Sequence, residues 1–119
     1  MVLSRRKSKV PPLPACPPQP CPLQQCMELL GGAWTPNIVW NLSGDPRRFS
    51  ELRSDIPNIS AKVLSARLRA LADKGVITRS VIDTSPPTVE YALTALGREL
   101  LPVIDAIERV GRKLAARAG

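Results

Sequence analysis

The residues from Ser60 to Lys74 carry side chains whose types and spacing suit contact with a polyanion. Steps of about 100° per residue along a helix place Lys62, Ala66 and Arg69 on one face. The opposite face is apolar and consists of Ala61, Leu64, Leu68 and Leu71. Small residues permit close approach to DNA, and long cations reach base edges or phosphates. A single cation on such a helix is more often part of an ordinary solvated face, but the position of these residues on the second helix of a helix-turn-helix favours a helix that enters a DNA groove.

Further hydroxyl and cationic side chains extend this predicted surface. Ser60 would cap the helix and offer its N-terminus to a phosphate, and Arg67 would flank the polar face. Arg47 and Arg48 precede the paired helices, where phosphate contacts independent of sequence are expected, with solvent-exposed arginines as the alternative. The remaining DNA-binding candidates lie on a predicted hairpin and are Arg79 and Thr84.

The second candidate chemistry is that of a thiol. Cys21 precedes Pro22 at the predicted start of a helix over residues 22–30, where the positive end of the helix dipole favours the reactive thiolate. Redox sensing through Cys21 and a capping thiol without a regulatory role both remain open. Cys16 would be able to reach Cys21 or a neighbouring subunit, whereas Cys26 lies on the apolar face of the helix. The spacing and the absence of histidine do not fit a zinc site, so no metal is expected.

These residues are positioned by a predicted series of short helices followed by a hairpin. Apolar spacings of three and four residues predict helices over residues 22–30, 35–43, 48–56 and 60–74. Two β-branched or alternating segments, 76–82 and 89–93, predict a hairpin with its tip at residues 83–88. Because the last two helices form a helix-turn-helix and the hairpin follows directly, the arrangement is that of a winged helix.

The C-terminal segment predicts one long helix over residues 94–117, capped by Thr94 and slightly kinked at Pro102. Its apolar residues recur with a period of 3.5, which is typical of a helix that packs along another helix. We therefore expect a dimer interface. The residues predicted to form it are Leu100, Val103, Ile107, Val110 and Leu114.

Composition sets the wider limits. The chain has 119 residues with 17 Lys+Arg and 10 Asp+Glu, and its formal net charge of +7 favours an anionic partner. Residues 1–20 are basic and rich in proline and predict a disordered arm, so residues 21–119 form the folded domain. Motifs for nucleotide, phosphate or acyl chemistry are absent, so neither an enzyme nor a cofactor is expected. With no apolar segment long enough to span a membrane, we expect a cytoplasmic protein.

The ordered motifs resemble those of the HxlR-type transcriptional regulators, a winged-helix family related to MarR proteins. The matching segments are Cys21–Pro22, Gly31–Trp34, Pro46–Arg53, Ile59–Ser60, Arg67–Leu71, Pro86–Thr94, Leu96–Arg98 and Leu100–Pro102. The resemblance implies a homodimer that binds double-stranded DNA at pseudo-palindromic operators. It also implies that Cys21 occupies the position at which several members respond to electrophiles or oxidants.

Together these features predict an α+β, mostly α, fold: a winged helix-turn-helix with a terminal dimerisation helix. The predicted function is sequence-specific, dimeric transcriptional regulation, with a thiol response through Cys21. The alternative is a protein-interaction module that uses the winged helix and the proline-rich arm. The sequence identifies no small-molecule effector.

Overall fold

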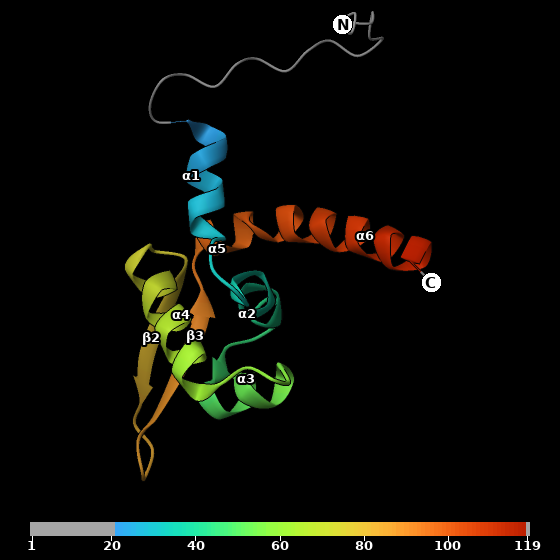
Figure 1. The fold of residues 1–119 in the computed structure, drawn as a ribbon. Coiled ribbons are helices and arrows are strands. Elements are labelled where there is room, and N and C mark those ends of the chain that lie inside the picture. The colour runs from blue at the N-terminus through green and yellow to red at the C-terminus, as the bar shows by residue number, and fades with distance from the viewer. Residues whose placement is uncertain (1–20, 119) are drawn as a thin grey trace, which may run out of the picture.

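The structure, a computed structural model, describes residues 21–118 and contains six helices and a small sheet in that range. The elements are α1 (Pro22–Leu29), α2 (Thr35–Asn41), β1 (Arg47–Arg48), α3 (Phe49–Asp55), α4 (Ala61–Asp73), β2 (Ile77–Ile82), β3 (Thr88–Leu93), α5 (Ala95–Glu99) and α6 (Leu101–Ala118). Helices α2, α3 and α4 and the hairpin form the body, whereas α1 and α6 project from it in different directions (Figure 1). The predicted winged helix-turn-helix is confirmed.

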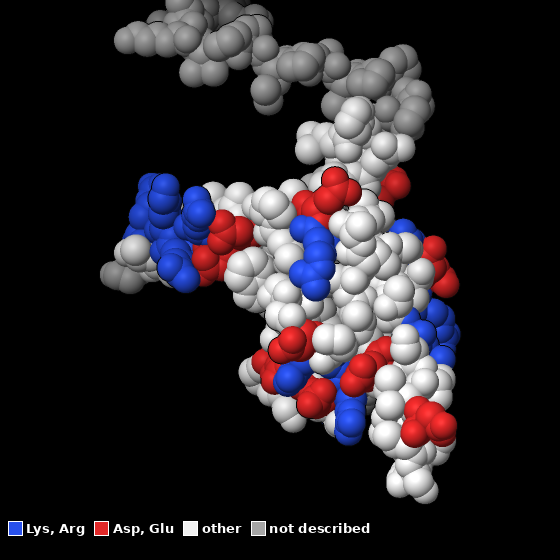
Figure 2. Space-filling model, turned by 180° about the vertical axis from the view of Figure 1, so that it is seen from behind, with Lys and Arg blue, Asp and Glu red and all other residues white. Residues whose placement is uncertain are grey.

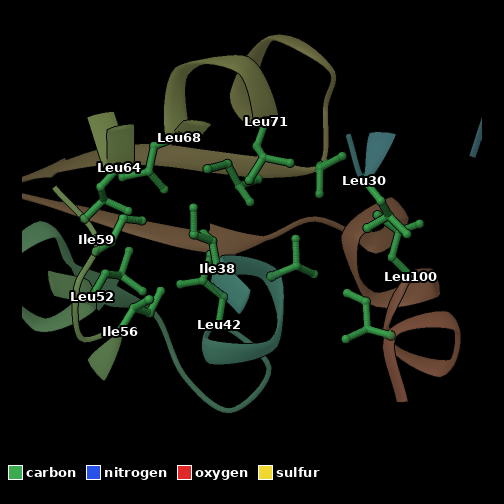
Figure 3. Close-up of a cluster of buried hydrophobic side chains, with 14 residues drawn as sticks. Leu30, Ile38, Leu42, Leu52, Ile56, Ile59, Leu64, Leu68, Leu71 and Leu100 are labelled. Carbon is green, nitrogen blue, oxygen red and sulfur yellow. The ribbon is translucent and has the colours of Figure 1, made fainter. Parts of the chain in front are cut away.

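The core of this body is aliphatic. Figure 3 shows leucine and isoleucine side chains from α2, α3 and α4 pointing toward one another. The apolar stripe of α4 is part of this core, since Leu64, Leu68 and Leu71 are buried. Ala61 is exposed, contrary to the predicted inward face, because it lies in the first turn at the margin of the contact. Burial of the leucine stripe fixes which face of α4 remains toward solvent.

The sheet has the strand order β1–β3–β2, and both pairs are antiparallel. The hairpin register runs from Ile77 opposite Leu93 to Ile82 opposite Thr88. Thr88 therefore belongs to β3, and the loop is residues 83–87, one residue shorter than expected. The short third strand was not predicted, because two residues carry no recognisable alternation.

The junction between the wing and the C-terminal helices is tightly built. The Thr94 hydroxyl lies 2.6 Å from the Gly75 carbonyl oxygen, to which it donates, and it accepts from the Gly97 amide at 3.1 Å. This is the predicted cap. A Cβ on Gly97 would lie 2.3 Å from the Val76 carbonyl oxygen, so the close packing of α5 against the chain requires glycine here.

The predicted single helix over residues 94–117 is wrong in one respect: it is divided into α5 and α6 at Leu100. Pro102, in the first turn of α6, has no amide hydrogen and cannot continue the bonding pattern of α5. The turn directs Leu100 into the chain's own core, where only 4% of it is exposed. Leu100 is therefore not available to a partner helix, contrary to the prediction. No helix between residues 21 and 118 combines the length and apolar character needed to cross a membrane.

Candidate nucleic-acid interface

Helix α4 presents the predicted polar face. Its N-cap is Ser60, whose hydroxyl oxygen accepts a hydrogen bond from the Val63 amide at 3.1 Å. Lys62, Ala66 and Arg69 are exposed, opposite the buried leucines. The sequence thus identified both the rotation of the helix and its capping residue, because each follows from local rules of helix geometry. What remains exposed is a narrow surface with two long cations separated by a small residue.

A hollow of about 330 Å³ joins this face of α4 to the wing. Its lining comes from α4 and from the paired strands: Ser65, Leu68, Arg69, Ala72, Asp73, Arg79 and Tyr91. Arg79 lies opposite Tyr91 in the sheet, and both line this hollow together with Arg69. The fold therefore places two of the predicted DNA-binding arginines at one site.

Three polar residues of this hollow, Ser65, Asp73 and Tyr91, were not predicted as part of the site. A signal for Asp73 existed, since helical steps of about 100° place it within about 20° of Lys62. No local signal could have indicated Tyr91, because its position depends on how the hairpin packs against α4. Asp73 adds a carboxylate to the otherwise cationic border of the hollow.

The two arginines before α3 have different surroundings. The Arg47 guanidinium donates from Nε and Nη2 to Asp55 Oδ2, at 3.0 and 2.6 Å, and its Nη1 lies 3.9 Å from Glu51 Oε2. Arg47 therefore holds β1 against α3, and its guanidinium is paired with carboxylates in the chain itself; the predicted phosphate contact of Arg47 stays a prediction. The side chain of Arg48 is exposed, and its backbone amide donates to Glu51 Oε1 at 2.8 Å.

Arg67 also lies elsewhere than predicted. Its Nε donates to the Ala33 carbonyl oxygen at 2.9 Å, so the guanidinium packs on the loop between α1 and α2. On the helix, Arg67 is about 140° from Lys62, which explains why it does not share the exposed face. The sequence could not reveal this contact, because the two residues are 34 positions apart.

The end of the wing carries one charged side chain, the exposed Asp83. The Thr84 hydroxyl donates to the Pro86 carbonyl oxygen at 2.8 Å, within the loop that closes the hairpin. Thr84 is exposed there, as a contact at the wing tip requires. Val81 is 62% exposed and lies on the same strand face as Arg79, two residues away. The wing thus offers the Arg79 guanidinium, the Thr84 hydroxyl and the Val81 side chain to a neighbouring groove, with the carboxylate of Asp83 beside Thr84.

The thiols lie on α1. Cys21 is the N-cap of this helix in an extended conformation, as predicted. Cys21 is disulfide-bonded. Cys16, which the sequence offered as a partner, lies outside the described residues, as does the predicted basic and proline-rich arm. Cys26 is a free, half-buried thiol.

Large apolar side chains are exposed on the two projecting helices. On α1 they are Leu23 and Met27. On α6 the predicted stripe remains uncovered along its length and consists of Val103, Ile107, Val110 and Leu114, which are 38–58% exposed. Trp40 of α2 is also partly exposed and borders a hollow of about 350 Å³ between α2 and α6. These surfaces lie apart from the polar face of α4.

Comparison with known proteins adds independent information. Residues 29–118 match the sequence model of the HxlR-like helix-turn-helix family. The chain is 41% identical over 91 residues to a regulator from Synechocystis sp., described as an uncharacterized HTH-type transcriptional regulator sll1512, across 76% of this chain and 67% of the relative. Among solved structures, a putative MarR-family transcriptional regulator from Porphyromonas gingivalis W83 aligns with a TM-score of 0.77 and 36% identity, covering 83% of this chain and 97% of that one. The redox regulator HypR in its oxidized form aligns with a TM-score of 0.74 and 32% identity, covering 78% and 96%.

Proposed function

Because the chain belongs to the HxlR-like helix-turn-helix family and is a transcriptional regulator of the helix-turn-helix type, we propose that it binds a pseudo-palindromic operator as a homodimer. The observation that carries the proposal is the exposed face of α4, with Lys62, Ala66 and Arg69 held outward by the buried leucine stripe. A helix of this kind fits the major groove of B-DNA, where arginine and lysine read base edges.

The wing supports the same orientation. Arg79 lines the hollow beside Arg69, so a duplex seated on α4 would meet both guanidinium groups. Val81 and Thr84 lie farther along the hairpin toward its tip and are exposed. In this arrangement the cations of α4 reach base edges and the phosphates that border the groove, while Arg79 and Thr84 contact the backbone beside it. Arg48 contributes a further phosphate contact from the start of α3, and the Ser60 end of α4 receives a phosphate.

Dimerisation rests on the apolar surfaces of α1 and α6. Burial of a large aliphatic side chain contributes about 1.5–3 kcal/mol, and the exposed α6 stripe contains four such side chains. A second copy would cover this stripe with the same stripe of its own, as a two-fold interface requires. Leu23 and Met27 of α1 would extend the contact. Two copies related in this way carry two α4 helices, which matches the two half-sites of a palindrome.

The test is a fluorescence titration of a labelled duplex from the region upstream of the protein's own coding sequence. We expect Arg69→Met to weaken binding by about 5- to 150-fold, the effect of losing a contact to a base edge. Arg109→Met is the matched control, because Arg109 is exposed on α6 and paired with Asp105 at 2.9 Å. Equal affinities of the wild type and of Arg69→Met would contradict the assignment of α4 as the reading helix.

We further propose that Cys21 makes this regulator responsive to thiol oxidation. Its place at the N-terminus of α1 suits a reactive sulfur, and the similarity to HypR, a redox regulator, supports the same role. Because Cys21 is disulfide-bonded in this structure, the protein is first reduced; a mild thiol oxidant should then change the DNA affinity of the wild type but not that of Cys21→Ser. Cys26→Ser is the control for the second thiol and should respond as the wild type does. A retained response in Cys21→Ser would reject Cys21 as the sensor.

A further inference from the structure

Two long cationic side chains, Arg67 on α4 and Lys74 at its C-cap, are not directed toward the proposed DNA surface. Arg67 donates to the carbonyl oxygen of Ala33 at 2.9 Å, and Lys74 Nζ donates to the carbonyl oxygen of Glu28 at 2.7 Å. Arg67 and Lys74 are seven residues apart, so they lie two turns apart on nearly the same side of α4. The acceptors are the last turn of α1 and the loop that follows it.

Both acceptors are groups that need a partner. The final carbonyl groups of a helix have no intrahelical donor, and they carry the negative end of the helix dipole. The Gly31 amide reaches the Glu28 carbonyl oxygen only at 3.5 Å, and the Lys74 ammonium group adds a shorter, charged donor at 2.7 Å. The contact at Ala33 has a complementary shape, because Gly32 has a φ of +94° and a Cβ there would lie 2.8 Å from Arg67 Nε. The guanidinium therefore occupies the space that a side chain at position 32 would fill.

We propose that Arg67 and Lys74 are positioning residues that fix the orientation of α4 relative to α1, and thereby set the separation of the two α4 helices in the dimer. This inference rests on the proposed function. A single hydrogen bond would leave the projecting α1 able to rotate about its contact with α4, whereas two contacts about 10 Å apart along the axis of α4 restrict that rotation. Because the apolar face of α1 belongs to the proposed dimer interface, each α4 is tied through α1 to the partner subunit.

The expected consequence concerns spacing rather than affinity alone. One base pair changes the separation of two half-sites by about 3.4 Å and their relative rotation by about 35°. A rigid pair of α4 helices cannot follow that change, but a loosely held pair can. Removal of the two donors should therefore relax the spacing preference, while the DNA-contacting face of α4 remains intact.

The experiment uses duplexes selected from random-sequence DNA by the full-length wild type, then synthesised with their half-sites one base pair closer or farther apart. For the wild type we expect the DNA affinity at the altered spacings to be lower than at the selected spacing by about fivefold or more, within the usual range of coupling between sites. In the double variant Arg67→Met/Lys74→Met, altered spacing should lower the affinity by less than about twofold, and the affinity for a duplex with a single half-site should change little. The double variant Arg67→Lys/Lys74→Arg retains both donors, so altered spacing should lower its affinity as much as it does for the wild type.

Lys62→Met is the control, since it should weaken binding to every duplex by a similar factor and leave the spacing preference unchanged. A spacing preference that persists in Arg67→Met/Lys74→Met overturns the inference while the proposed function stands. A selection in which the wild type enriches no paired half-sites contradicts the proposed dimeric operator, and the inference falls with it.

Discussion

The dependence of DNA affinity on salt gives the most direct test of which cations face the DNA. Lys62, Arg69 and Arg79 are exposed on α4 and the adjacent strand, and Arg69 and Arg79 border the same hollow. A homodimer would present about six such cations, and each phosphate contact contributes about −0.9 to the slope of log K against log salt. The slope from these residues is therefore about −5.4. From these residues alone, affinity should fall by roughly three orders of magnitude between 50 and 200 mM salt, and the proposed Arg48 contact would add to the fall.

Arg69→Met removes two of these cations from the dimer, so the slope should decrease in magnitude by about 1.8. Arg47→Met is the matched control, because the Arg47 guanidinium is already neutralised by Asp55 and approached by Glu51. Its removal should leave the slope almost unchanged. Fluorescence anisotropy at four or five salt concentrations measures both slopes. An equal decrease in both variants would show that Arg47 leaves its carboxylates on binding, and an unchanged slope in Arg69→Met would refute the proposed orientation of α4.

Two further variants test the dimer and the packing of the wing junction. Val110→Asp places a charge in the exposed stripe of α6 and should yield a monomer in sedimentation velocity. Val81→Asp is the control, because Val81 is a similarly exposed valine of the wing, and this variant should remain dimeric. Gly97→Ala should lower the free energy of unfolding by about 1–3 kcal/mol in chemical denaturation, because its Cβ would collide with the Val76 carbonyl oxygen. Gly44→Ala is the control and should leave the free energy of unfolding nearly unchanged, because no atom lies within 4 Å of the added Cβ. An equal decrease in the free energy of unfolding of both variants would contradict the packing described for Gly97.

The sequence predicted those features of the site that depend on neighbouring residues along the chain. The rotation of α4 follows from the spacing of its leucines, and the caps Ser60 and Thr94 follow from the residue types that accept a hydrogen bond from a helix N-terminus. These local rules were sufficient to place Lys62 and Arg69 on the exposed face. They were also sufficient for the winged-helix order of elements.

The partners of long cationic side chains were not predictable in this way. Arg47 pairs with a carboxylate eight residues away, and Arg67 reaches a carbonyl group on another helix-loop segment. The sequence predicts both as free surface cations, because no neighbouring residue indicates which group accepts their hydrogen bonds. Lys74 is similar, because its acceptor is 46 residues away. Tertiary packing decided which cations remain available to a ligand.

The period of 3.5 in the C-terminal segment left open which surface its apolar residues contact. It correctly indicated an apolar stripe, but periodicity alone does not distinguish contact with the chain's own core from contact with a second chain. Burial resolves this at Leu100, which packs within the subunit, whereas Leu96 of α5 is 38% exposed. The exposed residues of the predicted interface begin at Val103 and lie on α6.

This remaining stripe bears on the stability of α6 itself. Figure 2 shows Lys and Arg side chains gathered toward the free end of the helix, which extends away from the body. Two ion pairs of i,i+4 spacing, Asp105 with Arg109 and Glu108 with Arg112, lie on its surface at 2.9 and 2.6 Å. Exposed pairs of this type contribute about 0.3–0.5 kcal/mol each, and isolated helices of this length are marginal in water. Since burial of even half of one leucine side chain contributes as much as both pairs together, the apolar stripe rather than the charge must hold the outer turns of α6, and it does so only when a second surface covers it.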